Sequence, residues 1–195
     1  MGYRPGVTKV DDLQKREIED GIEHALTFID LRSAGLRIPV AENDSTKVVL
    51  ASGTVFKSAN LAAMLRNCEE VFLMAATAGS EIIEAIVKDT ERGRLTRGVI
   101  LDAVASEMVD ASLDWIADYY NRQVRRENRR LTKRRFSCGY GNFAIENQKT
   151  IHDILELNTI GITITENFIL VPEKSVTAVA GIRGMVTGDQ EGEEE

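Results

Sequence analysis

The chain has 195 residues, a formal net charge of −7 and an apolar fraction of 43%. This length fits one domain, or two small ones that share a core, and the apolar fraction excludes a globally disordered chain. No apolar run approaches the roughly 20 residues that span a bilayer. Two cysteines, two histidines and an N-terminus without a signal-peptide pattern argue against a disulfide scaffold or a cysteine-rich metal site, and we expect a cytoplasmic protein.

The first third of the sequence predicts a helix and two strands. Apolar residues recur at intervals of three and four over residues 10–34, and Gly35 is a plausible stop for this helix. A polar connection is expected over residues 39–45. Short strands are expected at residues 47–52 and 54–56, on either side of a bend.

The middle of the sequence predicts a buried strand between helices. A short helix is expected over residues 58–67, with Ser58 as its N-cap. Residues 70–77 are almost continuously apolar, as in a central strand that is buried on both faces. A helix over residues 81–91 follows a turn, and a longer helix over residues 96–120 comes after it.

The long helix has two different faces. Its apolar side chains share one face, which is expected to pack across the sheet: Leu101, Val104, Ala105, Met108, Trp115 and Tyr119. Three carboxylates spaced four residues apart lie near the opposite face: Asp110, Asp114 and Asp118. These acidic side chains are expected to face solvent.

The last third of the sequence predicts a loop, a helix and two strands. Residues 135–143 are rich in glycine and polar residues and are expected to form a loop. A helix is expected over residues 146–157. Residues 162–165 and 175–182 both alternate in character, so we predict an antiparallel hairpin of two strands with a turn at residues 172–174.

The order of these elements is helix, strands, helix, strand, three helices and a hairpin. Because this is not a regular alternation of strands and helices, an α+β fold is favoured, with a mainly antiparallel sheet flanked by helices. We expect a single domain over residues 1–187. Residues 188–195 are rich in carboxylates and contain no apolar side chain, which predicts a disordered acidic tail.

A basic stretch interrupts the acidic sequence between residues 122 and 135. It contains seven arginines and Lys133, against a single carboxylate at Glu127. One interpretation is a solvated helix end, whose cations favour the negative end of the helix dipole. The other is a surface that binds phosphate or an acidic partner. A nucleic-acid-binding module is an alternative against which the net charge argues.

The sequence lacks the common motifs of nucleotide-binding and hydrolytic enzymes. Only Gly79 is present where a dinucleotide fingerprint needs three glycines, and there is no P-loop pattern. Arg134 and Arg135 lie close to Cys138 in the sequence and are expected to lower the pKa of its thiol. Cys138 is therefore a candidate nucleophile, although a weak one. His24 and His152 stand alone, without the spacing of a metal site.

The strongest chemical signal is the segment 135–142, Arg-Phe-Ser-Cys-Gly-Tyr-Gly-Asn. The guanidinium of Arg135 can hold a carboxylate with two hydrogen bonds. Gly139 and Gly141 allow positive φ and a close approach of backbone amides to a ligand, and Tyr140 offers a ring face and a hydroxyl. These residue types suit an amino-acid-like ligand, and the alternative is an ordinary loop with an exposed arginine.

The segment resembles part of a known family, the S-adenosylmethionine-binding activation domain of cobalamin-dependent methionine synthase. Residues 135–141 are similar to the Arg-x-x-Pro-Gly-Tyr loop of that family, with Cys138 in place of the proline. Residues 146–155, 161–166 and 172–176 resemble, in the same order, its Lys-x-Thr-Ile helix, its Leu-Thr-Glu strand and its Pro-x-x-Ser-Val turn. Together these matches cover about the last third of the chain.

The resemblance implies a binding site for S-adenosylmethionine that is made of Asp110, Arg135, Ser137, Gly139, Tyr140 and Gly141. Arg135 matches the arginine that grips the methionine carboxylate, and Asp110 resembles the acidic residue near the ligand. Ser137 and Tyr140 match positions whose backbone contacts the ligand. Arg129 stands where the family pattern has a second acid.

The resemblance also implies a function. The chain would be a stand-alone activation subunit, inactive by itself, that binds S-adenosylmethionine for the reductive methylation of cob(II)alamin in a cobalamin-dependent methionine synthase. The implied partners are the cobalamin-carrying synthase subunit and a small acidic electron carrier of the flavodoxin or ferredoxin type. Two alternatives stay open: a ligand-free scaffold that docks on a corrinoid protein, and the nucleic-acid-binding module.

Overall fold

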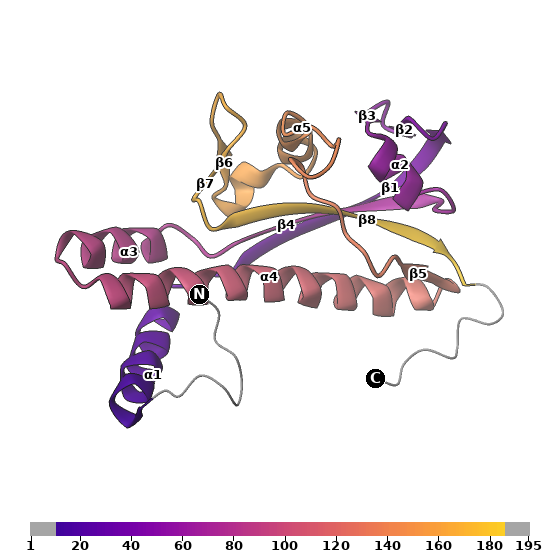
Figure 1. Cartoon of the computed structure of the whole chain (residues 1–195). Coiled ribbons are helices and arrows are strands. Elements are labelled where there is room, and N and C mark those ends of the chain that lie inside the picture. The colour runs from indigo at the N-terminus through magenta and orange to yellow at the C-terminus, as the bar shows by residue number, and fades with distance from the viewer. Residues whose placement is uncertain (1–10, 186–195) are drawn as a thin grey trace.

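The computed structural model of the chain describes residues 11–185, so the predicted acidic tail lies outside the described residues. No helix among these residues is long and apolar enough to cross a membrane. Figure 1 shows the elements, which in chain order are α1 (Asp12–Leu26), β1 (Arg32–Asn43), β2 (Lys47–Leu50), β3 (Val55–Lys57), α2 (Ala59–Met64), β4 (Glu70–Thr77), α3 (Glu81–Glu91), α4 (Leu95–Arg125), β5 (Arg129–Leu131), α5 (Asn147–Ile154), the 3-10 helix η1 (Leu157–Ile160), β6 (Thr163–Ile164), β7 (Leu170–Val171) and β8 (Ser175–Gly184).

Six of these strands form one antiparallel sheet. Their order is β3-β2-β1-β4-β8-β5, and every neighbouring pair is antiparallel. β6 and β7 form a separate two-stranded hairpin. The predicted α+β fold with a mainly antiparallel sheet is therefore confirmed.

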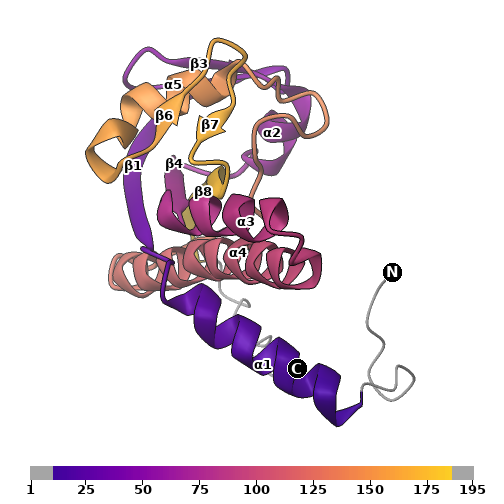
Figure 2. The ribbon, with the colours of Figure 1, turned by 90° about the vertical axis from the view of Figure 1, so that its left-hand side faces the viewer.

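Helices cover both faces of the sheet. α4 runs along one face with α3 beside it, and α1 extends away from α4 on the side opposite the sheet (Figures 1 and 2). The other face carries α2, α5, η1 and the β6–β7 hairpin. The sheet thus separates two hydrophobic cores.

The apolar run of β4 follows from its position between these two cores. Alternate side chains of a strand point to opposite faces of the sheet. Val71, Leu73 and Ala75 pack in the core shared with α2 and α5, whereas Phe72 and Met74 pack in the core shared with α4. The prediction of a central strand that is buried on both faces is confirmed.

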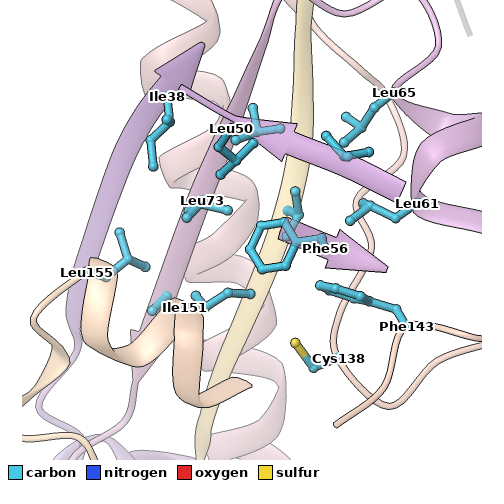
Figure 3. Packing of buried hydrophobic residues seen from close by; sticks show 14 of the residues in the cluster. Ile38, Leu50, Phe56, Leu61, Leu65, Leu73, Cys138, Phe143, Ile151 and Leu155 are labelled. Carbon is cyan, nitrogen blue, oxygen red and sulfur yellow. The ribbon is translucent and has the colours of Figure 1, made fainter. Parts of the chain in front are cut away.

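An aromatic pair lies in the core on the α5 side (Figure 3). Phe56 of β3 and Phe143, which follows the predicted ligand loop, meet edge to face with ring centroids 5.5 Å apart. Leu61 of α2 and Ile151 of α5 are fully buried in the same core. This packing joins the end of the loop to the edge of the sheet and to α5.

The region between α1 and β2 differs from the prediction. α1 ends at Leu26, and residues 32–43 form β1 instead of a helix end and a polar connection. β1 pairs with the buried strand β4 over residues 32–39. Gly35 lies in this strand against Phe72, whose ring would be 2.7 Å from a Cβ at the glycine. Pairing with β4 is a long-range contact that overrides the local helical periodicity.

The last strands also pair differently from the prediction. β6 pairs with β7, and β8 lies inside the large sheet between β4 and β5, so the predicted hairpin of residues 162–165 with 175–182 is wrong. β8 is buried on both faces for most of its length, because it borders both cores. The short edge strand β5, inside the basic stretch, was not predicted.

The predicted helices are present, with shifted ends. Ser58 caps α2, since its hydroxyl accepts a hydrogen bond of 3.1 Å from the backbone N–H of Leu61. α3 has the predicted bounds, and α5 is shorter than predicted at both ends. α4 is longer than predicted and runs into the basic stretch as far as Arg125.

The buried face of α4 is only partly the predicted one. Leu101 and Ala105 are fully buried against the sheet, as expected. Trp115 and Tyr119 are instead 61% and 44% exposed. In the second half of the helix, the buried residues are instead Val109, Leu113, Ile116 and Val124. The two aromatic residues are therefore left on the outside of the molecule.

Candidate functional site

A groove with a volume of about 1560 Å³ lies where α2, α4, β5, β8 and the loop after β5 meet. Four of the six predicted site residues line it: Asp110, Arg135, Ser137 and Tyr140. These residues come from a helix and a loop that are more than twenty positions apart in the sequence. The fold therefore brings the predicted acid and the predicted arginine to one wall.

The loop that carries Arg135 is fastened to β8 by backbone hydrogen bonds. Phe136 and Val179 each donate an N–H to the carbonyl of the other, at 2.8 Å in both directions. Thr132 N–H donates to the carbonyl of Gly181 at 2.8 Å, and Gly181 N–H donates to the Thr132 hydroxyl at 3.0 Å. The sheet thus fixes the backbone on both sides of Arg135.

Arg135 contacts two carboxylates of α4. Its Nη1 donates a hydrogen bond to Asp114 Oδ1, and its Nη2 lies 3.9 Å from Asp110 Oδ1. The arginine side chain is 31% exposed, whereas both carboxylates are about 70% exposed. Asp110 and Asp114 are one helical turn apart and share a face of α4. Arg135 on the groove wall therefore lies next to two accessible acids, of which Asp110 also lines the groove.

The two predicted glycines shape the loop and do not line the groove. Gly139 and Gly141 have positive φ values of 88° and 53°. Gly139 N–H donates to the carbonyl of Phe143 at 2.8 Å and closes a turn. A Cβ at Gly141 would overlap the side-chain amide of Asn60 and would lie 3.4 Å from the Phe136 ring. Both glycines therefore contact other residues of the chain and are not exposed to the groove.

Ser137 and Tyr140 both line the groove and are joined by a hydrogen bond within the turn. The N–H of Tyr140 donates to the carbonyl of Ser137 at 3.3 Å, so this amide is already used within the turn. The Tyr140 side chain is 69% exposed. Its ring and hydroxyl are accessible for a ligand, as expected from the residue type.

Several groove residues were missed at the level of the sequence. Asn60 comes from α2, Gln148 from α5, and Thr177 and Arg183 from β8. Thr177 Oγ1 donates to Gln148 Oε1 at 3.1 Å, which joins two of these elements. Gln148 lies in the segment 146–155 that resembles a family helix, whereas no local motif marks Asn60, Thr177 or Arg183, because only the folded chain brings them near the loop. For the missed acid Asp114, the spacing of four residues from Asp110 was an available signal.

The groove wall is rich in cations. Asp110 is the one carboxylate among the described residues that line it, whereas six cationic residues do so: Arg125, Arg130, Lys133, Arg134, Arg135 and Arg183. The Nε of Arg183 is buried and has no hydrogen-bond partner in the described part of the chain. A wall of this charge favours ligands or partners that carry carboxylate or phosphate groups.

Cys138 does not have the properties of a nucleophile. Its side chain packs in the core on the α5 side, and it is 7% exposed (Figure 3). Burial raises the pKa of the Cys138 thiol to about 12, so the predicted lowering by neighbouring arginines is wrong. The ring of His152 is engaged elsewhere, with Nε2 3.0 Å from the Ile162 carbonyl and Nδ1 3.1 Å from Asp153. Within residues 11–185 no three potential ligands are grouped to hold a metal ion.

Part of the basic stretch is engaged in ion pairs outside the groove. Arg129 Nη2 lies 2.7 Å from Glu69, and Arg129 also contacts Glu70. Arg37 of β1 pairs with Glu70 at 3.0 Å and with Glu127 at 2.6 Å. The hydrogen bond from Arg37 lowers the pKa of the Glu127 carboxyl. Neither Arg129 nor Glu127 lines the groove, so these residues stabilise the β1–β4–β5 surface instead.

The fold was compared with those of known proteins. No family model and no curated protein matches the sequence. Among solved structures, the crystal structure of the MetH reactivation domain bound to AdoHcy matches with a TM-score of 0.66 and 16% sequence identity. The match covers 93% of this chain and 70% of the solved chain. The protein therefore has the fold of the methionine synthase activation domain.

Proposed function

We propose that the groove binds S-adenosylmethionine, with the amino-acid end of the ligand at Arg135. The observation that carries this proposal is that Arg135, on the groove wall, contacts Asp114 and lies beside Asp110, the carboxylate that lines the groove. The guanidinium suits the α-carboxylate of the ligand, and the carboxylates of Asp110 and Asp114 suit its ammonium and sulfonium charges. The similar solved domain is described as bound to AdoHcy, which shares the amino-acid and adenosine parts of this ligand.

The size of the groove supports a ligand together with a second group. Sites for small molecules usually have volumes of roughly 300–1,000 Å³, and this groove has about 1560 Å³. A nucleoside ligand at Arg135 would therefore leave part of the groove open. We assign the remaining space to the group that a partner protein brings to the ligand.

The residues of this chain have a positioning role in the proposed reaction. Bound S-adenosylmethionine supplies a methyl group, and its thioether leaving group is neutral, so the chain needs no general acid or base. Arg135 fixes the carboxylate, and Asp110 and Asp114 hold the cationic part of the ligand. Such alignment, together with the exclusion of water, is what a binding protein contributes to a methyl transfer.

The proposed biological role is the reactivation of a cobalamin-dependent methionine synthase. In this proposal the partner carries the cobalamin, this chain brings S-adenosylmethionine, and a small acidic electron carrier provides the electron. The cationic groove wall supports an acidic partner, because opposite charges accelerate and orient encounter. The runner-up role is a scaffold that docks on a corrinoid protein without a ligand.

A reactivation assay tests the role. A methionine synthase that lacks its own reactivation domain is trapped as cob(II)alamin and mixed with this chain, S-adenosylmethionine and a one-electron reductant. We expect methionine formation to recover only when all three additions are present, and Arg135→Ala to reduce the recovery. Docking on the synthase without recovery, at saturating S-adenosylmethionine, would favour the scaffold instead.

A further inference from the structure

The outer surface of α1 and α4 carries an unusual number of exposed large apolar side chains. Seven of them lie on α1, on the segment that follows it and on the second half of α4: Leu13, Ile18, Ile22, Leu26, Leu31, Trp115 and Tyr119, each between 39% and 77% exposed. Single exposed apolar residues are normal, but a group of this size on one side of a protein marks an interaction surface.

α1 is an arm that contacts the body over a small part of its surface. It leaves α4 on the side away from the sheet and extends beyond the body (Figures 1 and 2). Its buried residues are Gly21 and Ala25, and Gly21 lies so close to Ile100 that a Cβ would be 2.8 Å from its Cγ2. Ile18, Ile22 and Leu26, spaced four apart, form an apolar stripe that stays largely exposed. An isolated helix of 15 residues is only marginally stable in water, so α1 is expected to need a partner that packs on this stripe.

The second half of α4 offers a hollow beside an aromatic platform. Trp115 and Tyr119 stack with ring centroids 5.6 Å apart and an interplanar angle of 10°. Trp115, Met108 and Ala111 line a hollow of about 310 Å³ together with Leu31. Leu31 comes five residues after the last residue of α1, so a short segment connects the arm to the hollow beside the platform.

We propose that the chain forms a two-fold dimer in which the α1 arm of each copy packs on the Trp115 platform of the other. In a two-fold interface the same surface meets itself, so a chain that carries both a projecting apolar ridge and an apolar hollow is complementary to its own copy.

The exposed area is sufficient for such a dimer. The seven side chains expose about 450 Å² of apolar surface on each copy, taking about 200 Å² for a fully exposed aromatic side chain and about 100 Å² for an aliphatic one. Because interfaces are roughly 60% apolar, this corresponds to about 750 Å² per copy, close to the roughly 800 Å² per partner of a standard stable interface. The exposed apolar area is therefore of the size that a stable dimer needs.

The single tryptophan of the sequence gives a direct test, since Trp115 lies in the proposed interface. The full chain is measured by light scattering after size exclusion and by tryptophan fluorescence over a dilution series. We expect a dimer mass that falls to 21.6 kDa on dilution, with an emission maximum that moves to longer wavelength at the same concentrations. A monomer at every concentration would overturn the proposal.

Two variants separate this interface from any other. Ile22→Glu on the arm and Trp115→Ala on the platform should each weaken dimerisation at least about 30-fold, as expected for central interface residues. Both positions are exposed, so each variant should still unfold in one cooperative transition. Ile169→Glu, an exposed apolar position on the β6–β7 hairpin, is the matched control and should dimerise like the parent. A dimer that persists in both variants would contradict the assignment of this surface.

Discussion

Arg135 is held by Asp114 and lies near Asp110, while its backbone is fastened to β8 on both sides. A side chain that is already oriented loses less conformational entropy when it binds a ligand. The guanidinium also presents two parallel donors, which a lysine ammonium does not. These properties make Arg135 the residue whose substitution is most informative about the ligand.

We expect Arg135→Ala to weaken binding of S-adenosylmethionine by about 10-fold to 150-fold, since hydrogen bonds to charged groups contribute roughly 1.5–3 kcal/mol. Arg135→Lys should recover only part of the affinity, because a point charge does not replace the planar fork. Arg122→Ala, on the exposed side of the same basic stretch, is the control and should bind like the parent. Isothermal titration measures all three, and equal affinity of Arg135→Ala and the parent would exclude the carboxylate contact.

Gly141 provides a second prediction at the scale of the residue. Gly141→Ala combines a positive φ with overlap against Asn60, and we expect it to lower the free energy of unfolding by about 2–4 kcal/mol. Gly53→Ala is the matched control, because its φ is 84° but nothing lies within 4 Å of the added Cβ, so only about 1–2 kcal/mol of backbone strain is expected. Chemical denaturation compares the two, and equal losses would show that packing at Gly141 is unimportant.

The chemistry of the loop was easier to predict than its contacts. Arg135 and Asp110 were both chosen from the sequence, and the structure brings them to within 3.9 Å. The glycines were expected near the ligand, yet they face Asn60 and Ile145 of the protein. The type of a residue shows which backbone conformations and hydrogen bonds it can adopt. Which residues it contacts depends on helices and strands that lie elsewhere in the chain.

The secondary-structure elements were also predicted correctly where the signal is local and missed where it depends on distant contacts. β4 was correctly predicted because a strand between two cores needs apolar side chains on both faces, which leaves a continuous run in the sequence. β1 was missed because its residues 32–34 continue the helical spacing of α1, and its pairing with β4 is visible only in the folded chain. β5 has three residues, too few for a pattern, and two of them are arginines.

The joint between α3 and α4 depends on Asp89, a buried carboxylate near the end of α3. It accepts a hydrogen bond from Arg94 and lies 3.0 Å from Arg97 Nε, so it ties the turn to the start of α4. Asp89→Ala should lower the free energy of unfolding by about 1–3 kcal/mol, less than for a fully buried pair because both arginines are partly exposed.

Thermal unfolding checks this prediction about the α3–α4 joint. A loss of this size corresponds to a decrease in Tm of about 2–12 °C for a chain of this length. Glu91→Ala, at an exposed position of the same helix, is the control and should change the free energy of unfolding by less than about 0.5 kcal/mol. An unchanged Tm for Asp89→Ala would mean that the ion pairs do not stabilise the joint.

At the scale of the whole molecule, the sheet places the groove at the junction of its two helical layers. α4 supplies Asp110 from one layer, α2 and α5 supply polar residues from the other, and β5 and β8 hold the loop between them. This is why the proposed ligand site needs the complete sheet order, and why the sequence motifs near residue 135 predicted only one side of it. The cationic wall adds a surface that would attract an acidic partner.

The central claim is that the groove recognises the amino-acid end of an S-adenosyl ligand, and one titration tests it most directly. The parent chain is titrated with S-adenosylmethionine, with S-adenosylhomocysteine and with 5′-methylthioadenosine, which keeps the nucleoside and lacks the carboxylate and ammonium. We expect the first two to bind and the third to bind at least about 10-fold more weakly, in line with the loss of the charge-assisted contacts at Arg135. Absence of S-adenosylmethionine binding, or equal affinity for 5′-methylthioadenosine, would contradict the assignment of the groove.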